Sequence, residues 1–231
     1  MHKSLLTATA LVSSALFLVP GAQAFDWDGP YVGGVIGVVK STGEIDWNVF
    51  DSGDFYPYTF EFDGTGLLIG VTSGINFTLD DKYVVGIEGD ASLAFLKSEG
   101  VFDDFDYGEF EEELHSLLTL RGRAGVLSDD KDTYFFVTGG LAGGHVTANA
   151  YIEASEGGGE IEPIALSGFV FGVIGGVGVE HAITEDITVK GEILAYKLGS
   201  LSGSGYAGKG EANAVYQPSG FILRTGINFH F

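Results

Sequence analysis

The feature that most restricts the fold of this chain is a two-residue alternation of bulky apolar side chains, clearest at the C-terminus. From Phe221 to Phe231 the odd positions are apolar apart from Thr225, whereas the even positions include Arg224 and His230. Successive side chains of a β-strand point to opposite faces, so this spacing puts the apolar residues on one face of a strand. A helix would scatter them around its axis. The segment is therefore predicted to be a long strand with one apolar face.

The same alternation recurs along the chain. With the C-terminal segment included, it predicts eight strands, at residues 31–41, 67–79, 83–95, 114–126, 133–151, 169–183, 187–196 and 221–231. The faces of the first and fifth of these strands stay open, because pairs of glycines interrupt the pattern there. Tight polar turns are predicted at 80–82, 128–132 and 185–186, and long connections at 43–65, 98–113, 153–163 and 199–218. Short turns at one end and long loops at the other predict an all-β fold, an eight-stranded antiparallel up-and-down transmembrane β-barrel.

The polarity of the opposite strand face distinguishes two kinds of eight-stranded barrel. Soluble carriers have an apolar interior and a polar exterior, and membrane barrels have the reverse. In the assigned strands the face opposite the apolar one carries four acids and four bases: Glu88, Asp90, Glu180, Glu192, Arg121, Arg123, Lys190 and Arg224. Because the whole chain has a formal net charge of −21, this balance predicts a paired charge network inside a plugged lumen. The alternative is a soluble sandwich with these charges facing solvent.

The N-terminal segment is predicted to be a secretory signal peptide, residues 1–24, followed by the barrel domain, residues 25–231. Lys3 gives a positive start, Leu5–Val19 is uncharged and mostly apolar, and Ala22-Gln23-Ala24 has the small residues of a cleavage site. A membrane anchor is the weaker alternative, because the apolar stretch is short for a spanning helix. The chain contains no cysteine, which excludes disulfides, thiol catalysis and cysteine-ligated metals.

The surplus negative charge is concentrated in the long connections, above all in residues 99–113. Phosphate backbones repel such a chain, so nucleic acid is excluded as a partner. Carboxylates on loops can hold divalent cations, which would bridge them to anionic lipopolysaccharide. A solvated acidic surface is the simpler interpretation. No spacing matches an EF-hand, and we predict neither a metal site nor a cofactor.

Two motifs resemble a known group of proteins. The segment from Trp27 to Gly34, with its Tyr-Val-Gly-Gly end, is similar to the first strand of small Gram-negative outer-membrane barrels, the opacity-protein and OmpA-like β-barrel superfamily with its porin-family relatives. The segment from Tyr134 to Ala142 resembles their fifth strand. The resemblance implies location in the cell outer membrane, with membrane lipid and lipopolysaccharide as partners. It also implies that the aromatic end, Phe229 and Phe231, is the signal read by the outer-membrane assembly machinery.

For activity the resemblance is a weak guide, because the superfamily includes anchors, adhesins, small porins and a few enzymes. It implies an integral surface protein with a structural envelope role and weak porin-like permeability. The alternative is an adhesin or binding protein acting through its loops, where Trp47, Tyr58 and Phe102 stand among carboxylates. The sequence names neither a ligand nor an oligomeric state.

Catalysis is predicted to be absent. Some relatives modify lipid A, using a His and a Ser two residues apart on one strand face. Here His115 and Ser116 are adjacent, so the pleat turns them to opposite faces. His230 is predicted to point inward and His181 outward. A lipid-modifying enzyme is therefore the least favoured of the three functions.

Overall fold

The computed structural model describes residues 25–51, 54–102, 107–153, 164–207 and 210–231. It describes side chains for residues 25–42, 63–97, 111–149, 165–204 and 215–231. The predicted signal peptide, residues 1–24, lies outside the described part.

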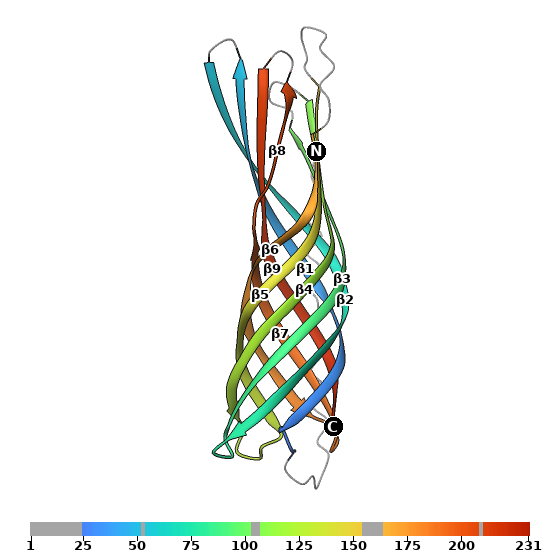
Figure 1. The fold of residues 1–231 in the computed structure, drawn as a ribbon. Coiled ribbons are helices and arrows are strands. Elements are labelled where there is room, and N and C mark those ends of the chain that lie inside the picture. The colour runs from blue at the N-terminus through green and yellow to red at the C-terminus, as the bar shows by residue number, and fades with distance from the viewer. Residues whose placement is uncertain (1–24, 52–53, 103–106, 154–163, 208–209) are drawn as a thin grey trace, which may run out of the picture.

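The described part of the chain winds into one tilted, closed barrel (Figure 1). Neighbouring strands pair antiparallel, and β1 also pairs with β9, which closes the sheet. The strands are β1 (Gly29–Asp51), β2 (Asp54–Leu79), β3 (Tyr83–Phe102), β4 (Tyr107–Leu127), β5 (Thr133–Glu153), β6 (Ile164–Ala182), β7 (Ile187–Leu198), β8 (Leu201–Ala207) and β9 (Gly210–His230). No helix that could cross a membrane occurs among the described residues.

β7 and β8 are two parts of one barrel strand. Both pair with β9, β7 up to Lys197 opposite Ser219 and β8 from Leu201 opposite Tyr216 onward. Residues 199–200 interrupt them. The barrel therefore has eight strands, and the predicted eight-stranded antiparallel fold is confirmed.

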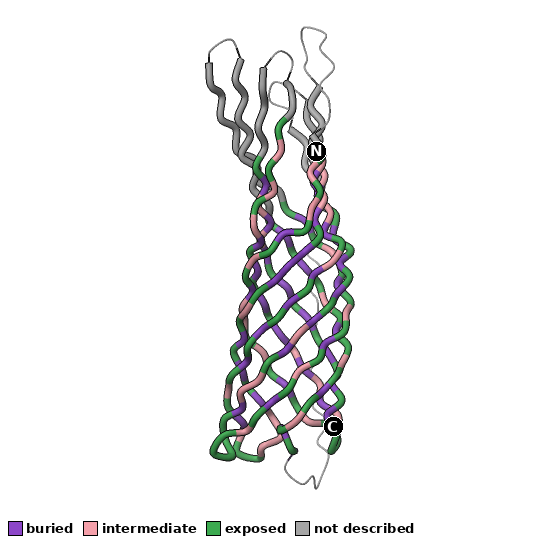
Figure 2. Tube along the Cα trace, viewed as in Figure 1, coloured by how far each residue is buried: buried purple, intermediate pink, exposed green. Residues whose placement is uncertain are grey.

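The apolar face of the strands points outward. Phe171 is 74% exposed and Val71 64%, whereas Leu194 and Val39 on the opposite face are fully buried. Buried and exposed residues alternate along each strand of the barrel wall (Figure 2). A water-soluble protein rarely exposes a continuous apolar surface of this size, so the exterior is built to contact lipid.

The long connections predicted from the sequence are wrong in extent. β1 and β2 remain paired as far as Asp51 opposite Asp54, and β3 and β4 as far as Phe102 opposite Gly108. β8 and the first half of β9 occupy much of the predicted connection at 199–218. Backbone pairing does not require an apolar face, so strands that extend beyond a membrane lose the apolar alternation from which they were predicted. Residues 154–163 of the remaining predicted connection are outside the described residues.

Beyond the barrel wall the sheet divides in two. Pairing between β2 and β3 ends at Thr65 opposite Lys97, and pairing between β6 and β7 ends at Gly172 opposite Leu198. From there β8–β9–β1–β2, called here the first sheet, and β3–β4–β5–β6, the second sheet, continue as separately paired units (Figure 1). We call this the hairpin end of the barrel, and the opposite one, with its tight turns at 80–82, 128–132 and 183–186, the short-turn end.

Candidate functional site

The candidate site is the lumen of the barrel, where inward side chains form three successive layers. An aromatic cap fills the short-turn end, a charge network lies next to it, and an apolar layer occupies the half toward the hairpin end. The named side chains of the three layers are between 0% and 8% exposed.

The eight charged residues singled out from the sequence all lie together in this lumen, and Glu88 is the centre of their contacts. Its carboxylate pairs with Arg121, with Lys190 Nζ at 2.6 Å and with Arg224 Nη2 at 3.5 Å. Arg123 Nη1 is also 3.5 Å away, and the Tyr31 hydroxyl donates to Glu88 Oε2 at 2.7 Å. Four cations from three strands therefore converge on one carboxylate.

The other three acids complete the pairing. Arg121 bridges Asp90 at 2.9 Å and Glu192 at 3.0 Å, and Arg224 contacts the same two carboxylates at 3.2 and 2.7 Å. Glu180 pairs with Arg123 at 2.9 Å. An isolated charge in such a place would cost many kcal/mol of solvation, so mutual neutralisation is the condition for burying any of them.

Neutral polar groups donate further hydrogen bonds to these carboxylates. Thr119 donates to Asp90 at 2.5 Å, and Thr188 and the amide of Asn228 donate to Glu180 at 2.5 and 2.7 Å. Each of these bonds replaces part of the solvation that a carboxylate loses on burial. The network is thus a rigid cross-brace between opposite walls rather than a water-filled passage.

The aromatic cap consists of residues that precede β1 and of inward residues of the strands: Phe25, Trp27, Tyr31, Tyr134, Phe136 and His230. The Trp27 indole N–H donates to the carbonyl of Lys131, in a tight turn, at 2.8 Å. The His230 ring stacks on Tyr31 at 5.2 Å between centroids, and the Arg123 guanidinium lies 4.6 Å from the centroid of the Tyr31 ring. The segment before the first strand is therefore folded into the short-turn end of the barrel, and Tyr31 joins the aromatic cap to the charge network.

Replacing Trp27 with phenylalanine is expected to lower the free energy of unfolding by about 1–2 kcal/mol. The smaller ring leaves the Lys131 carbonyl without its donor and leaves a gap beside Tyr134. The measurement is urea unfolding in lipid vesicles, followed by the loss of the fast-migrating folded band on an unheated gel. Tyr83→Phe, on the exposed exterior, is the matched control and should change stability by less than about 0.5 kcal/mol. Equal midpoints for the two variants would contradict a packed cap.

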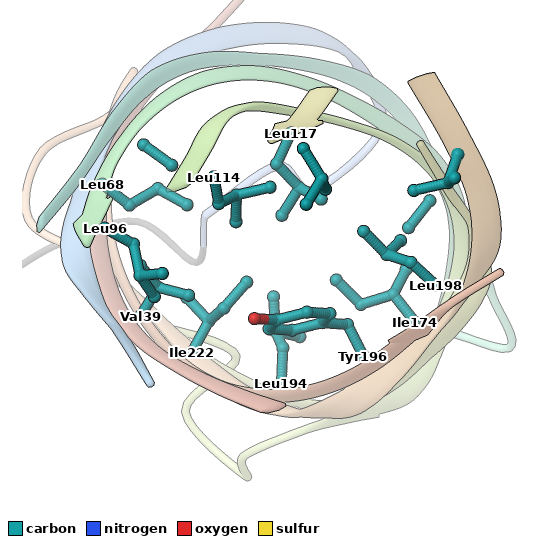
Figure 3. Packing of buried hydrophobic residues seen from close by; sticks show 14 of the residues in the cluster. Val39, Leu68, Leu96, Leu114, Leu117, Ile174, Leu194, Tyr196, Leu198 and Ile222 are labelled. Atoms are coloured by element: carbon teal, nitrogen blue, oxygen red, sulfur yellow. The ribbon is translucent and has the colours of Figure 1, made fainter. Parts of the chain in front are cut away.

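The apolar layer fills the lumen between the charge network and the hairpin end. Side chains from all parts of the wall point to the barrel axis (Figure 3). The members labelled there are Val39, Leu68, Leu96, Leu114, Leu117, Ile174, Leu194, Tyr196, Leu198 and Ile222. β4 contributes two of them only because its register with β5 shifts between Leu114 and Ser116, so that Leu114 and Leu117 both point inward.

A buried polar cluster at the hairpin end, beyond the three layers, was missed by sequence reasoning. Glu112 was expected in an acidic loop but is fully buried on β4, and its Oε1 accepts a hydrogen bond from Ser41 Oγ at 3.1 Å. Its chain neighbours Glu111 and Glu113 face outward, above the apolar exterior, and pair with Lys97 and His115. Glu112 thus lies outside the membrane-spanning part. Burial raises the pKa of its carboxyl, and hydrogen bonds from Tyr216 and Ser41 lower it by less.

The remaining singled-out residues are on the surface or in the cap. Phe229 and Phe231 point outward and are 50% and 77% exposed. His230 lies inward and His181 outward, as predicted. His115 is exposed, with Nε2 3.3 Å from the Thr147 hydroxyl and 3.5 Å from Glu113. In the part of the chain that the structure describes, no group of three or more His, Asp or Glu is arranged to hold a metal ion.

Sequence comparison places the chain among known proteins. The family model of the outer membrane protein beta-barrel domain matches residues 8–229. The 31 kDa outer-membrane immunogenic protein of Brucella melitensis biotype 1 is 28% identical over 219 residues, which cover 90% of this chain and 81% of that protein. A protein of the same name from Brucella suis biovar 1 matches with the same values.

Two solved structures are similar at low identity. OprG of Pseudomonas aeruginosa aligns with a TM-score of 0.47 and 11% identity, covering 90% of this chain and 99% of that one. The outer membrane protease OmpT of Escherichia coli aligns with a TM-score of 0.36 and 12% identity, covering 91% and 99%. The family match spans almost the whole of a closed barrel with an apolar exterior, and the chain therefore belongs to the outer membrane β-barrel family and is an outer-membrane protein.

Proposed function

We propose that this protein is a sealed integral barrel with a structural role at the cell surface and no catalytic activity. The short-turn end would face the periplasm and the hairpin end the exterior, as in other bacterial barrels of this type. The observation that carries the proposal is the filled lumen, in which an aromatic cap, a paired charge network and an apolar layer follow one another.

The filled lumen argues against steady porin-like permeability. An ion on the axis would have to separate bonds such as Lys190 to Glu88 at 2.6 Å and then cross the apolar layer without water. The cost of desolvating an ion in such surroundings is many kcal/mol. Weak leakage would therefore need a rearrangement of the lumen.

Planar bilayer recordings test the proposal. Protein whose folding has been verified by heat-dependent gel mobility is expected to leave the conductance of the bilayer at its background value. A large water-filled porin, reconstituted in parallel, is the positive control. Sustained single-channel steps from the purified protein would contradict the sealed barrel and favour the porin-like function.

A binding function is the second candidate, and the strand extensions favour it. β1 and β2 stay paired well beyond the apolar wall, so the hairpin end is a sheet rather than a set of short loops. The Brucella relative is named an immunogenic protein, which is consistent with a surface that other molecules reach. Shortening the β1–β2 hairpin would separate the candidates: loss of cell attachment by correctly folded protein would support an adhesin.

The proposed partners are outer-membrane lipid, lipopolysaccharide and the assembly machinery. Lys40 and Lys97 lie on the exterior at the upper edge of the apolar wall, where lipid phosphates would be found. The outward, exposed position of Phe229 and Phe231 on the last strand leaves their side chains accessible to a chaperone or insertase.

A further inference from the structure

Glu112 joins the two sheets where they separate. Ser41 lies on β1 and Tyr216 on β9, both in the first sheet, whereas Glu112 lies on β4 in the second sheet. Glu112 Oε1 accepts a hydrogen bond from Ser41 Oγ at 3.1 Å, and the Tyr216 side chain lies beside the Glu112 carboxyl and interacts with it. The Tyr196 hydroxyl on β7 is buried next to Ser41. No backbone pairing links the sheets at this level in the described residues. This cluster is therefore a side-chain tie across the opening of the barrel at the hairpin end, called here the mouth.

Among the described side chains, no arginine or lysine pairs with Glu112, whereas the four carboxylates of the charge network all have such a partner. Glu88, Asp90, Glu180 and Glu192 each contact an arginine or lysine. The described side chains that interact with Glu112 are hydroxyl groups, Ser41 on β1, Tyr196 on β7 and Tyr216 on β9, and its strand partner on β5 is Ala148. Only the two tyrosines among them titrate, and a tyrosine is neutral or anionic, never a cation.

Burial without a cation makes the tie dependent on protonation. The protonated carboxyl is neutral and fits a dry site, whereas the carboxylate carries an uncompensated charge that is solvated only if water reaches it. The direction of the pH dependence follows from the raised pKa of Glu112. Stabilisation of the closed mouth is complete below the ordinary pKa of glutamate and is lost as the pH rises through the raised value.

We propose that Glu112 is a proton-controlled tie that holds the first and second sheets together in acid and lets them separate, and water enter the mouth, when it ionises. The device is independent of the envelope role, because the charge network and aromatic cap below it keep the lumen closed in either state.

Electron paramagnetic resonance distances between the sheets test the proposal. The natural chain has no cysteine, so Ser204→Cys on β8 and Asn149→Cys on β5 give one spin label on each sheet. In lipid nanodiscs, the distance distribution is expected to be narrow near about pH 4 and to shift reversibly to longer, broader values near about pH 8. Glu112→Gln, a neutral side chain of the same shape, should remain narrow at both values.

Glu113→Gln is the matched control, because Glu113 is the outward neighbour of Glu112 on the same strand. It should keep the full pH response. Heat-dependent gel mobility verifies that each variant folds. A doubly labelled parent whose distances do not change with pH would overturn the proposal, and so would a Glu112→Gln variant that retains the response.

Discussion

Replacing Glu88 with alanine is expected to destabilise the barrel by about 3–5 kcal/mol, the range typical of removing one partner from a buried ion pair. Glu88 contacts Arg121, Arg123, Lys190 and Arg224. Its removal leaves more positive than negative charge in a lumen that excludes water. Arg121 and Arg224 keep Asp90 and Glu192 as partners, but Lys190 keeps only Glu192, at 3.6 Å. The ammonium of Lys190, left with this one long contact, should dominate the cost.

The measurement is equilibrium unfolding in urea with the protein in lipid vesicles, where the fraction folded is followed by gel mobility. Glu113→Ala, which removes an exposed carboxylate from a neighbouring strand, is the control and should change stability by less than about 1 kcal/mol. A second variant, Glu88→Gln, keeps the shape but not the charge and should lie between the two. If Glu88→Ala unfolds at the same urea concentration as Glu113→Ala, the network is not a stabilising brace.

The strand wall and the lumen charges could be predicted from the sequence for one physical reason. A pleated strand places alternate residues on opposite faces. If the apolar residues form the exterior of a closed barrel, the residues between them point into the lumen and contact one another there. Glu88 and Asp90 on β3, and Arg121 and Arg123 on β4, are each two apart and therefore share the inner face. Strand pairing then brings Glu88 directly opposite Arg121.

The features that the sequence did not show depend on information other than alternation. A bulge shifts the parity of β4, and Glu112 can be placed on the inner face only when that shift is known. The strands beyond the wall have no lipid-facing side and therefore no apolar alternation. Their acidic residues were for this reason assigned to loops. The apolar layer did leave a signal, because Leu67-Leu68-Ile69 and Phe221-Ile222-Leu223 are apolar on both faces. Such runs mark the level where the lumen becomes as apolar as the exterior.

Two adjacent glycines of β5 differ in the space that is available for an added side chain on the inner and the outer face of the wall. Gly140 points inward opposite Arg121, and a Cβ built there would lie 2.1 Å from the Leu120 carbonyl oxygen and 2.7 Å from the Arg121 Cα. Gly139 points outward, and the nearest atom to its Cβ would be the Ile174 carbonyl oxygen at 3.8 Å. The inward contacts are with backbone, which cannot yield without moving β4.

Gly140→Ala is therefore expected to lower the free energy of unfolding by about 1–3 kcal/mol or more, the cost of overpacking a filled interior. Gly139→Ala, one residue away, should stay within about 0.5 kcal/mol of the parent. Urea unfolding in vesicles measures both, and the folded yield shows whether Gly140→Ala assembles at all. Because the two variants add the same methyl group to the same strand, changes in β-propensity and in the unfolded chain largely cancel between them. Only the face differs, so equal stabilities would mean that β4 and β5 are not packed against each other as closely as the inward contacts of Gly140 require.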